Sequence, residues 1–135
     1  MMDFKTLENQ PIGTRIDLDL LLGQVRWNPD GLIPAIAQQQ DTGEVLMLAW
    51  MNEQALRETL STGQVCYWSR SRQTYWRKGE SSGHRQRLVE ARLDCDGDAL
   101  LLLVNQQGPA CHTYRPNCFY VQVNDTGGTI ISQPE

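Results

Sequence analysis

The sequence predicts a single α+β domain with a mostly antiparallel sheet and one main helix. Its 135 residues are enough for one domain with a substantial core. Short apolar runs alternate with turn residues, which is typical of strands joined by hairpins, and one segment carries apolar residues at helical spacing. Because we find no internal repeat or linker, we expect residues 1–135 to form one unit.

The first half of the chain predicts two strands followed by the main helix. Asn52 is a favourable N-cap and Gly63 a natural C-terminal stop. Residues 1–30 are weakly patterned. The expected elements are a short helix at Asp17–Leu22, a turn at Trp27–Gly31, strands at Leu32–Gln38 and Val45–Trp50 joined by the turn Asp41–Gly43, and a helix at Glu53–Ser61 in which Ala55, Leu56 and Leu60 have helical spacing.

The second half predicts four further strands around a long loop. Loops of such length in a small domain are often functional. The expected elements are a strand at Val65–Ser69, a loop at Arg70–Gly83, strands at Arg87–Cys95 and Ala99–Gln106 joined by the turn pair Asp96-Gly97, an irregular stretch at Gly108–Asn117, a last strand at Phe119–Val123 and a loose tail around Gly127-Gly128.

Composition predicts a globular protein of the reducing cytoplasm. Hydrophobic residues make up 40% and charged residues 21% of the chain, and the net charge of -4 argues against binding nucleic acid. Met1–Pro11 has no apolar core and so is not a secretory signal, and the apolar run Ala99–Val104 is too short to span a membrane. Four cysteines are too few for a disulfide scaffold and are more often metal ligands in a reducing compartment.

Positive charge is concentrated in one segment of this acidic chain. Only Glu80 and Glu90 oppose it there. The segment is either a solvated strand face or a pocket for a phosphorylated small molecule, since arginine matches phosphate with a bidentate fork. Seven of the twelve basic residues belong to it: Arg70, Arg72, Arg77, Lys78, Arg85, Arg87 and Arg92.

Three cysteines in the second half predict a zinc site. Cys95, Cys111 and Cys118 supply soft thiolates, and three protein ligands leave a fourth position open for water, as in catalytic zinc sites. Their spacing does not match a zinc finger, so three small buried apolar residues are the alternative. However, Cys111 and Cys118 flank a polar loop, which is a poor place for inert core. Cys66 fits a core position of a strand better than a ligand.

Three alternating aspartates predict a second site, for a hard cation such as magnesium. Asp94, Asp96 and Asp98 would share one face of an extended strand or converge at a hairpin tip. The alternative is a solvated acidic turn. An EF-hand is excluded, because positions six and twelve of the loop would be Ala99 and Asn105 rather than glycine and glutamate.

Two histidines are candidates for proton transfer. His112 follows a predicted zinc ligand, so it is either a fourth ligand, a proton shuttle or a hydrogen-bonded structural residue. His84 lies in the glycine- and serine-rich end of the long loop and is a second acid–base candidate.

Together these motifs resemble the phosphoribosyl-AMP cyclohydrolase family of histidine biosynthesis. The resemblance covers about residues 31–120 in the family's order, and only Tyr114–Asn117 departs from it, where the family usually has a glycine after the threonine and a serine before the last cysteine. The matching segments are Gly31–Ala35, Gly43–Asn52, Trp68–Arg72, Trp76–His84, Asp94–Leu101, Ala110–Thr113 and Cys118–Tyr120.

The resemblance implies a metal-dependent hydrolase that adds water to an adenine ring and breaks its N1–C6 bond. It implies a homodimer in which Cys95 of one subunit and Cys111 and Cys118 of the other hold Zn²⁺, while the three aspartates hold Mg²⁺. Zinc lowers the pKa of bound water to about 7, which would supply hydroxide. Since the chain ends soon after its last strand, we expect the monofunctional form rather than one fused to a pyrophosphohydrolase.

Substrate contacts and rival functions follow from the same motifs. We expect Ser69, Arg70, Arg72 and Lys78 to bind the substrate and its phosphates, and His112 or His84 to protonate the leaving nitrogen. A structural zinc module would need zinc to fold but would show no turnover. A nucleic-acid-binding protein would use the aromatic residues among the arginines, which the acidic remainder of the chain disfavours.

Overall fold

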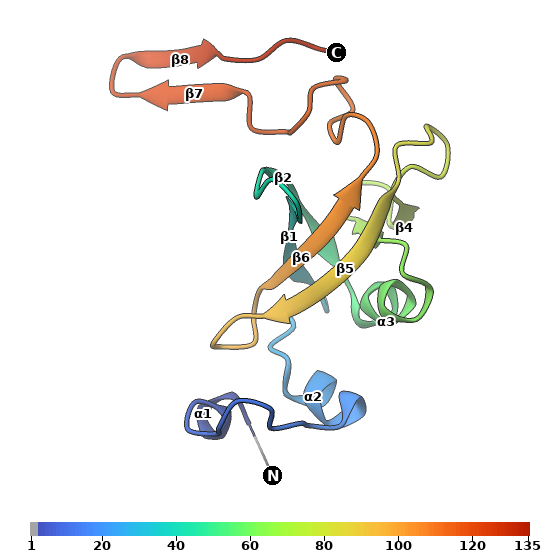
Figure 1. The fold of residues 1–135 in the computed structure, drawn as a ribbon, viewed down its shortest axis with the longest axis vertical. Helices are drawn as coiled ribbons and strands as arrows, with labels where there is room; N and C mark the ends of the chain where they lie inside the picture. The colour runs from blue at the N-terminus through green and yellow to red at the C-terminus, as the bar shows by residue number, and fades with distance from the viewer. Residues whose placement is uncertain (1–2) are drawn as a thin grey trace.

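A four-stranded mixed sheet forms the centre of the computed structural model, which describes residues 3–135 (Figure 1). Its strand order is β2-β1-β6-β5. Strand β1 (Ile33–Gln39) pairs antiparallel with β2 (Val45–Met51), and β5 (Gln86–Leu93) pairs antiparallel with β6 (Leu100–Gln106). The middle pair, β1 with β6, is parallel. The α+β class is therefore confirmed, but the sheet is mixed, because its two antiparallel pairs are joined through a parallel one.

The two middle strands bury alternate side chains, and this places the core. Ile33, Ala35 and Ala37 of β1 are fully buried, and so are Leu102 and Val104 of β6. Because successive side chains of a strand point to opposite faces, each strand presents one apolar face to the core. Most of the remaining core side chains come from β2, β3 and the main helix, and the others are Leu22, Val25, Val65, Leu100 and Ala110.

The main helix forms as the capping residues predict. Helix α3 (Glu53–Thr62) begins after Asn52, whose Oδ1 accepts a hydrogen bond of 2.8 Å from the backbone N–H of Ala55. It ends at Gly63, whose φ of 78° is the left-handed conformation that favours glycine. Leu60 is more exposed than its spacing suggests, because Thr59 is the residue that faces the core.

The helix packs on a second, two-stranded sheet. Strands β3 (Cys66–Ser69) and β4 (Thr74–Arg77) are antiparallel, and α3 lies against β3. The prediction of one continuous loop over Arg70–Gly83 was wrong, since β4 lies inside it. The cause is a cross-strand aromatic pair, in which Trp68 contacts Tyr75 with ring centroids 5.0 Å apart.

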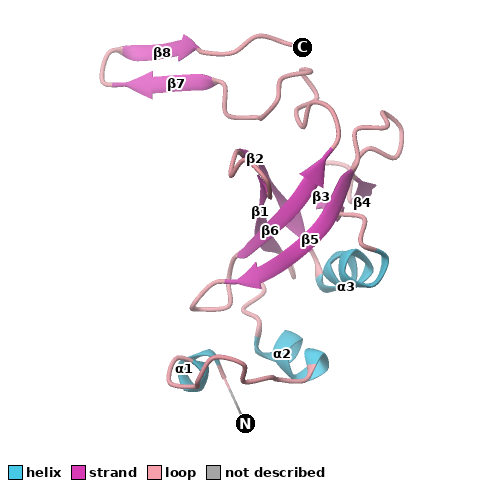
Figure 2. Cartoon of the chain, viewed as in Figure 1, coloured by secondary structure: helices cyan, strands magenta, loops and turns pink. Residues whose placement is uncertain are grey.

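The two ends of the chain lie at opposite ends of the molecule (Figures 1 and 2). Helices α1 (Phe4–Leu7) and α2 (Leu18–Gln24) form one end. The short helix expected at Asp17–Leu22 is therefore confirmed, with Asp17 as its N-cap and its end at Gln24. At the other end β7 (Val121–Asn124) and β8 (Gly127–Ile130) form a hairpin, so the prediction of a loose tail was wrong. No helix among residues 3–135 is long and apolar enough to cross a membrane.

Replacing Thr59 with valine should lower the free energy of unfolding by about 1–3 kcal/mol, the cost of leaving a buried polar group unpaired. The Thr59 hydroxyl is buried, accepts from the backbone N–H of Cys66 (2.9 Å) and donates to the carbonyl of Ala55 (2.8 Å). Valine keeps the shape but leaves that N–H unpaired. Thr62→Val at an exposed position is the matched control and should change stability by less than about 0.5 kcal/mol. Equal urea midpoints for the two variants would contradict this role.

Candidate active site and metal ligands

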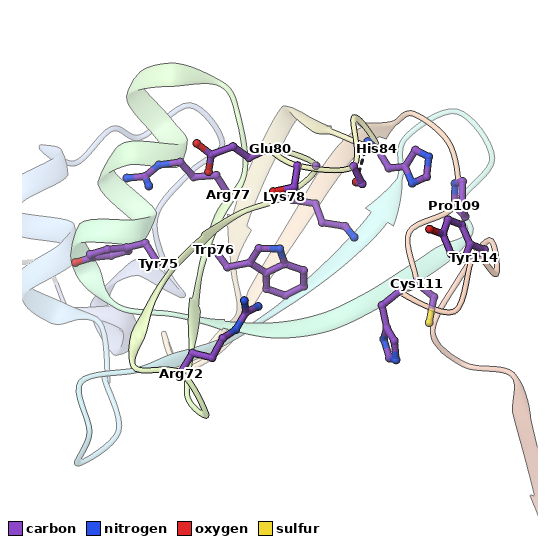
Figure 3. A pocket seen from close by; sticks show the side chains of 14 residues that line it. Arg72, Tyr75, Trp76, Arg77, Lys78, Glu80, His84, Pro109, Cys111 and Tyr114 are labelled. Atoms are coloured by element: carbon purple, nitrogen blue, oxygen red, sulfur yellow. Dashed lines mark hydrogen bonds between the residues drawn. The ribbon is translucent and has the colours of Figure 1, made fainter.

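The basic segment faces the loop after β6 across a cavity of about 460 Å³, which we call the first hollow. Figure 3 shows Arg72, Trp76 and Lys78 on one side of it and Cys111 and Tyr114 on the other. Both predicted histidines also line it, so the fold gathers residues from three separate motifs. The lining is completed by Tyr75, Arg77, Gly79, Glu80, Ser81, Ser82, His84, Pro109 and His112.

The loop between β6 and β7 folds back on itself and brings two of the predicted zinc ligands together. The N–H of Cys111 donates to the carbonyl of Arg115 (3.2 Å), and the N–H of Cys118 donates to Leu46 of β2 (2.8 Å). Tyr114 has a φ of 64°, in the left-handed region. Glycine adopts this region at little cost, so tyrosine at this departure from the family pattern strains the loop without separating the two cysteines.

The pKa values of the two neighbouring thiols shift in opposite directions. Cys118 donates a hydrogen bond to Cys111, and burial together with the neighbouring Cys111 raises the pKa of Cys118 to about 11. Burial also disfavours the Cys111 thiolate, but hydrogen bonds from Thr113, whose hydroxyl is 3.0 Å from the sulfur, and from Cys118 outweigh it and lower the pKa of Cys111. Such a pair of adjacent sulfurs suits a soft cation.

Lys78 ties the two sides of the first hollow together. Its amine donates to the carbonyl of Ala110, next to Cys111, and lies 5.3 Å from the centroid of the Trp76 ring. Burial lowers the pKa of Lys78, while the two cysteines oppose that shift. The position between the sulfurs and the aromatic wall makes Lys78 the best-buried cation of the predicted phosphate-binding set.

The two histidines differ in how firmly they are held. His84 is half-buried, and its ring lies edge-on to Tyr114 with centroids 6.3 Å apart. A Cβ at Gly108 would lie 2.6 Å from the His84 ring, so the absence of a side chain there lets the ring approach the loop backbone. His112 is exposed and adjacent to Cys111. Sequence analysis missed Tyr114, because a tyrosine in a polar loop carries no signal of its own.

The β5–β6 turn and the loop after β6 lie at opposite ends of β6 (Figure 1). By their positions in the sequence, Cys95 belongs to this turn and Cys111 and Cys118 to this loop. Seven extended residues separate the ends of this strand, a distance of about 20 Å. Accordingly, no cluster of three or more His, Cys, Asp or Glu side chains that fits a metal ion occurs within residues 3–135. One chain therefore brings together two of the three predicted zinc ligands, and Cys95 is exposed at the hairpin tip.

The three aspartates surround Cys95 in the exposed turn between β5 and β6. The Oδ1 atom of Asp94 accepts from the N–H of Asp98 (3.0 Å), so it also shapes the turn. The facing Asp94 carboxyl raises the pKa of Asp98, and Asp96 adds to this repulsion. Carboxylate oxygens are ligands that suit a hard cation. Within residues 3–135, however, the three aspartates do not close into a group that fits a metal ion, and their contacts are those of a solvated acidic turn.

The predicted phosphate-binding residues are divided between two neighbouring cavities. Arg72 and Lys78 line the first hollow. Ser69 and Arg70 line a separate cavity, and Arg72 and Trp76 contribute to both cavities.

Fold and site together define a small α+β domain with a basic, aromatic-walled cavity beside a pair of thiols. The model of the phosphoribosyl-AMP cyclohydrolase family matches residues 47–120, which include every predicted site residue. The chain belongs to this family.

Relatives match the chain over nearly its whole length. It is 70% identical to phosphoribosyl-AMP cyclohydrolase 2 of Pseudomonas fluorescens, over 95% of this chain and 87% of the relative. It is 63% identical to the phosphoribosyl-AMP cyclohydrolase of Alkalilimnicola ehrlichii, over 98% and 93% of the two chains. The enzyme of the same name from Hydrogenovibrio crunogenus is 59% identical, over 98% and 90%.

Replacing Glu58 with glutamine should destabilise the protein at pH 7 but not in acid. The Arg77 guanidinium donates two hydrogen bonds of 2.8 Å to Glu58 and lowers the pKa of this carboxyl from its ordinary 4.5. The stabilisation is therefore complete above pH 4.5 and is lost as the pH falls through the lowered pKa of the folded protein.

Urea unfolding of both proteins at a series of pH values measures this difference. Glu53→Gln is the control, because Glu53 pairs with Arg57 within the helix and is more exposed than Glu58. A difference between wild type and Glu58→Gln that stays constant down to pH 2 would show that the ion pair does not contribute.

Proposed function

We propose that the protein is a phosphoribosyl-AMP cyclohydrolase of histidine biosynthesis. In this reaction the oxygen of water bonds to C6 of the adenine ring, the N1–C6 bond breaks, and N1 gains a proton. The observation that carries the proposal is the first hollow, in which the thiol of Cys111, two histidines and basic side chains from separate motifs meet inside the segment that matches the family.

The donor sets fit the two metals that we propose. Cys111 and Cys118 offer adjacent sulfurs for Zn²⁺, with Cys95 as the third ligand, and Asp94, Asp96 and Asp98 offer hard carboxylate oxygens within one turn for Mg²⁺. Zinc, when bound, would supply a water of lowered pKa and hence a nucleophile near neutral pH. The separation of Cys95 from the other two thiols supports a homodimer in which each zinc site takes ligands from both chains.

A second feature supports association of two chains. All residues of β7 and β8 are exposed, among them the apolar side chains of Val121, Val123 and Ile130. An isolated two-stranded hairpin is at best marginally stable in water, and exposed apolar groups favour contact with a partner. We propose a second copy of this chain as that partner.

The side chains of the first hollow then have distinct tasks. Arg72 binds a phosphate with its planar fork, and Trp76 provides an apolar wall that reduces the access of water. Lys78 holds the loop that carries Cys111 and adds positive charge beside the substrate. His112 and His84 are the groups that accept or donate the proton at N1.

Purified protein should open the ring of phosphoribosyl-AMP, and Cys111→Ser should lose both bound zinc and turnover. The reason is that the serine hydroxyl is a far weaker zinc ligand than a thiolate. Ring opening is followed by absorbance, and zinc by elemental analysis. Cys66→Ser, at a buried cysteine away from the hollow, is the matched control and should keep its zinc. Bound zinc without turnover in the wild type would favour the structural zinc module instead.

Replacing His112 with alanine should reduce kcat about 100-fold or more while zinc remains bound, which is the usual contribution of general acid–base catalysis. His84→Ala in the same hollow is the comparison, because its ring is held by packing and its loss alters the cavity shape. Near-normal kcat of His112→Ala with full zinc content would assign the proton transfer to His84.

A further inference from the structure

Two neighbouring arginines of the turn between β3 and β4 make no ion pair. Arg57, Arg77 and Arg92 each pair with a carboxylate, but within residues 3–135 no carboxylate pairs with Arg70 or Arg72. Both are exposed, they lie two residues apart, and they line one cavity that no acidic residue lines. In a chain of net charge -4, this local positive field favours the binding of an anion.

A second cavity of about 460 Å³ lies beside these arginines, and we call it the second hollow. Strand β2 contributes Trp50 to its lining, strand β3 contributes Ser69, and the β3–β4 turn contributes Arg70 and Ser71. Arg72 and Trp76 line both hollows, so the two cavities adjoin at these side chains. A molecule that fills the first hollow can therefore extend past Trp76 into the second.

Backbone and side-chain contacts hold the turn in one arrangement. The N–H of Gln73 donates to the carbonyl of Ser69 (2.8 Å), and the Gln73 side chain donates to the carbonyl of Arg70 (2.7 Å). The Arg70 guanidinium lies 4.6 Å from the centroid of the Trp50 ring. The Trp50 ring restricts the Arg70 guanidinium before any ligand is bound. Arg70 therefore loses less side-chain conformational entropy when it binds an anion.

The chemistry of the second hollow is that of a phosphate site. Two guanidinium groups and two serine hydroxyls donate hydrogen bonds, and tryptophan walls limit competition from water. Asp30 shares a neighbouring cavity with Arg70 and Trp68, but it makes no ion pair with Arg70. Nothing acidic lines the second hollow itself, so its field favours an anion.

We propose that the second hollow binds one of the two phosphoribosyl arms of the substrate, while the ring reacts in the first hollow. This inference rests on the proposed function. Phosphoribosyl-AMP carries one such arm on N1 and the other on the opposite side of the purine, so an enzyme that holds both needs two anion sites. Arg72, between the hollows, and Arg70, in the second, then determine specificity for a doubly phosphorylated substrate.

Replacing Arg70 with glutamine should raise the KM for phosphoribosyl-AMP at least tenfold and change kcat by less than about threefold. The lost contact is remote from the reacting carbon and binds ground state and transition state alike. Arg15→Gln removes the same charge at an exposed position that lines neither hollow, and its KM should match that of the wild type. Inhibition by AMP distinguishes the arms: it weakens in Arg70→Gln if the second hollow holds the AMP phosphate, and is unchanged if it holds the arm on N1.

A second variant controls for the case in which Arg70→Gln misfolds. Ser71 is exposed in the turn, so Ser71→Glu should fold normally and raise KM by placing a carboxylate beside the phosphate. Unchanged KM in both Arg70→Gln and Ser71→Glu, with an active wild type, would overturn the second hollow as a subsite and leave the proposed function intact. An inactive wild type would instead overturn the proposed function itself.

Discussion

Strand β6 is the constraint on which the proposed chemistry depends. Its seven extended residues separate the turn that carries Cys95 from the loop that carries Cys111 and Cys118 by about 20 Å. The strand is fixed by parallel pairing with β1 and antiparallel pairing with β5, and its inward side chains form the core. Neither end can move toward the other without disrupting that core, so three thiols meet only if two chains contribute them.

The sheets and helix α3 also determine where the basic side chains of this acidic protein lie. Helix α3 packs against β3, and Glu58 of the helix neutralises Arg77. Lys78 donates a hydrogen bond to the carbonyl of Ala110. Within residues 3–135 no carboxylate pairs with Arg70 or Arg72, so these two side chains remain available to an external anion. A substrate with two phosphates would then be held at points on both sides of Trp76, with its ring beside the thiol loop.

Local signals explain what the sequence could predict. Asn52 and Gly63 define α3 because caps act within a few residues. The polar loop flanked by Cys111 and Cys118 indicates that these cysteines are not inert core, and the structure brings their thiols together. Long-range pairing left no such signal, so the parallel β1–β6 pair was not predicted. Strand β4 was missed because serine, glycine and arginine around it favour a loop. Residue spacing alone also did not predict that Cys95 lies far from Cys111 and Cys118 within one chain.

X-ray absorption at the zinc edge tests the central claim most directly, because it counts the sulfur ligands of the bound metal. A zinc site shared by two chains predicts three sulfurs at about 2.3 Å in the wild type and two in Cys95→Ser. The claim also predicts that the zinc-loaded protein sediments as a dimer. Two sulfurs in the wild type, with no change in Cys95→Ser, would show that each chain binds zinc with Cys111 and Cys118 alone and would contradict the shared site.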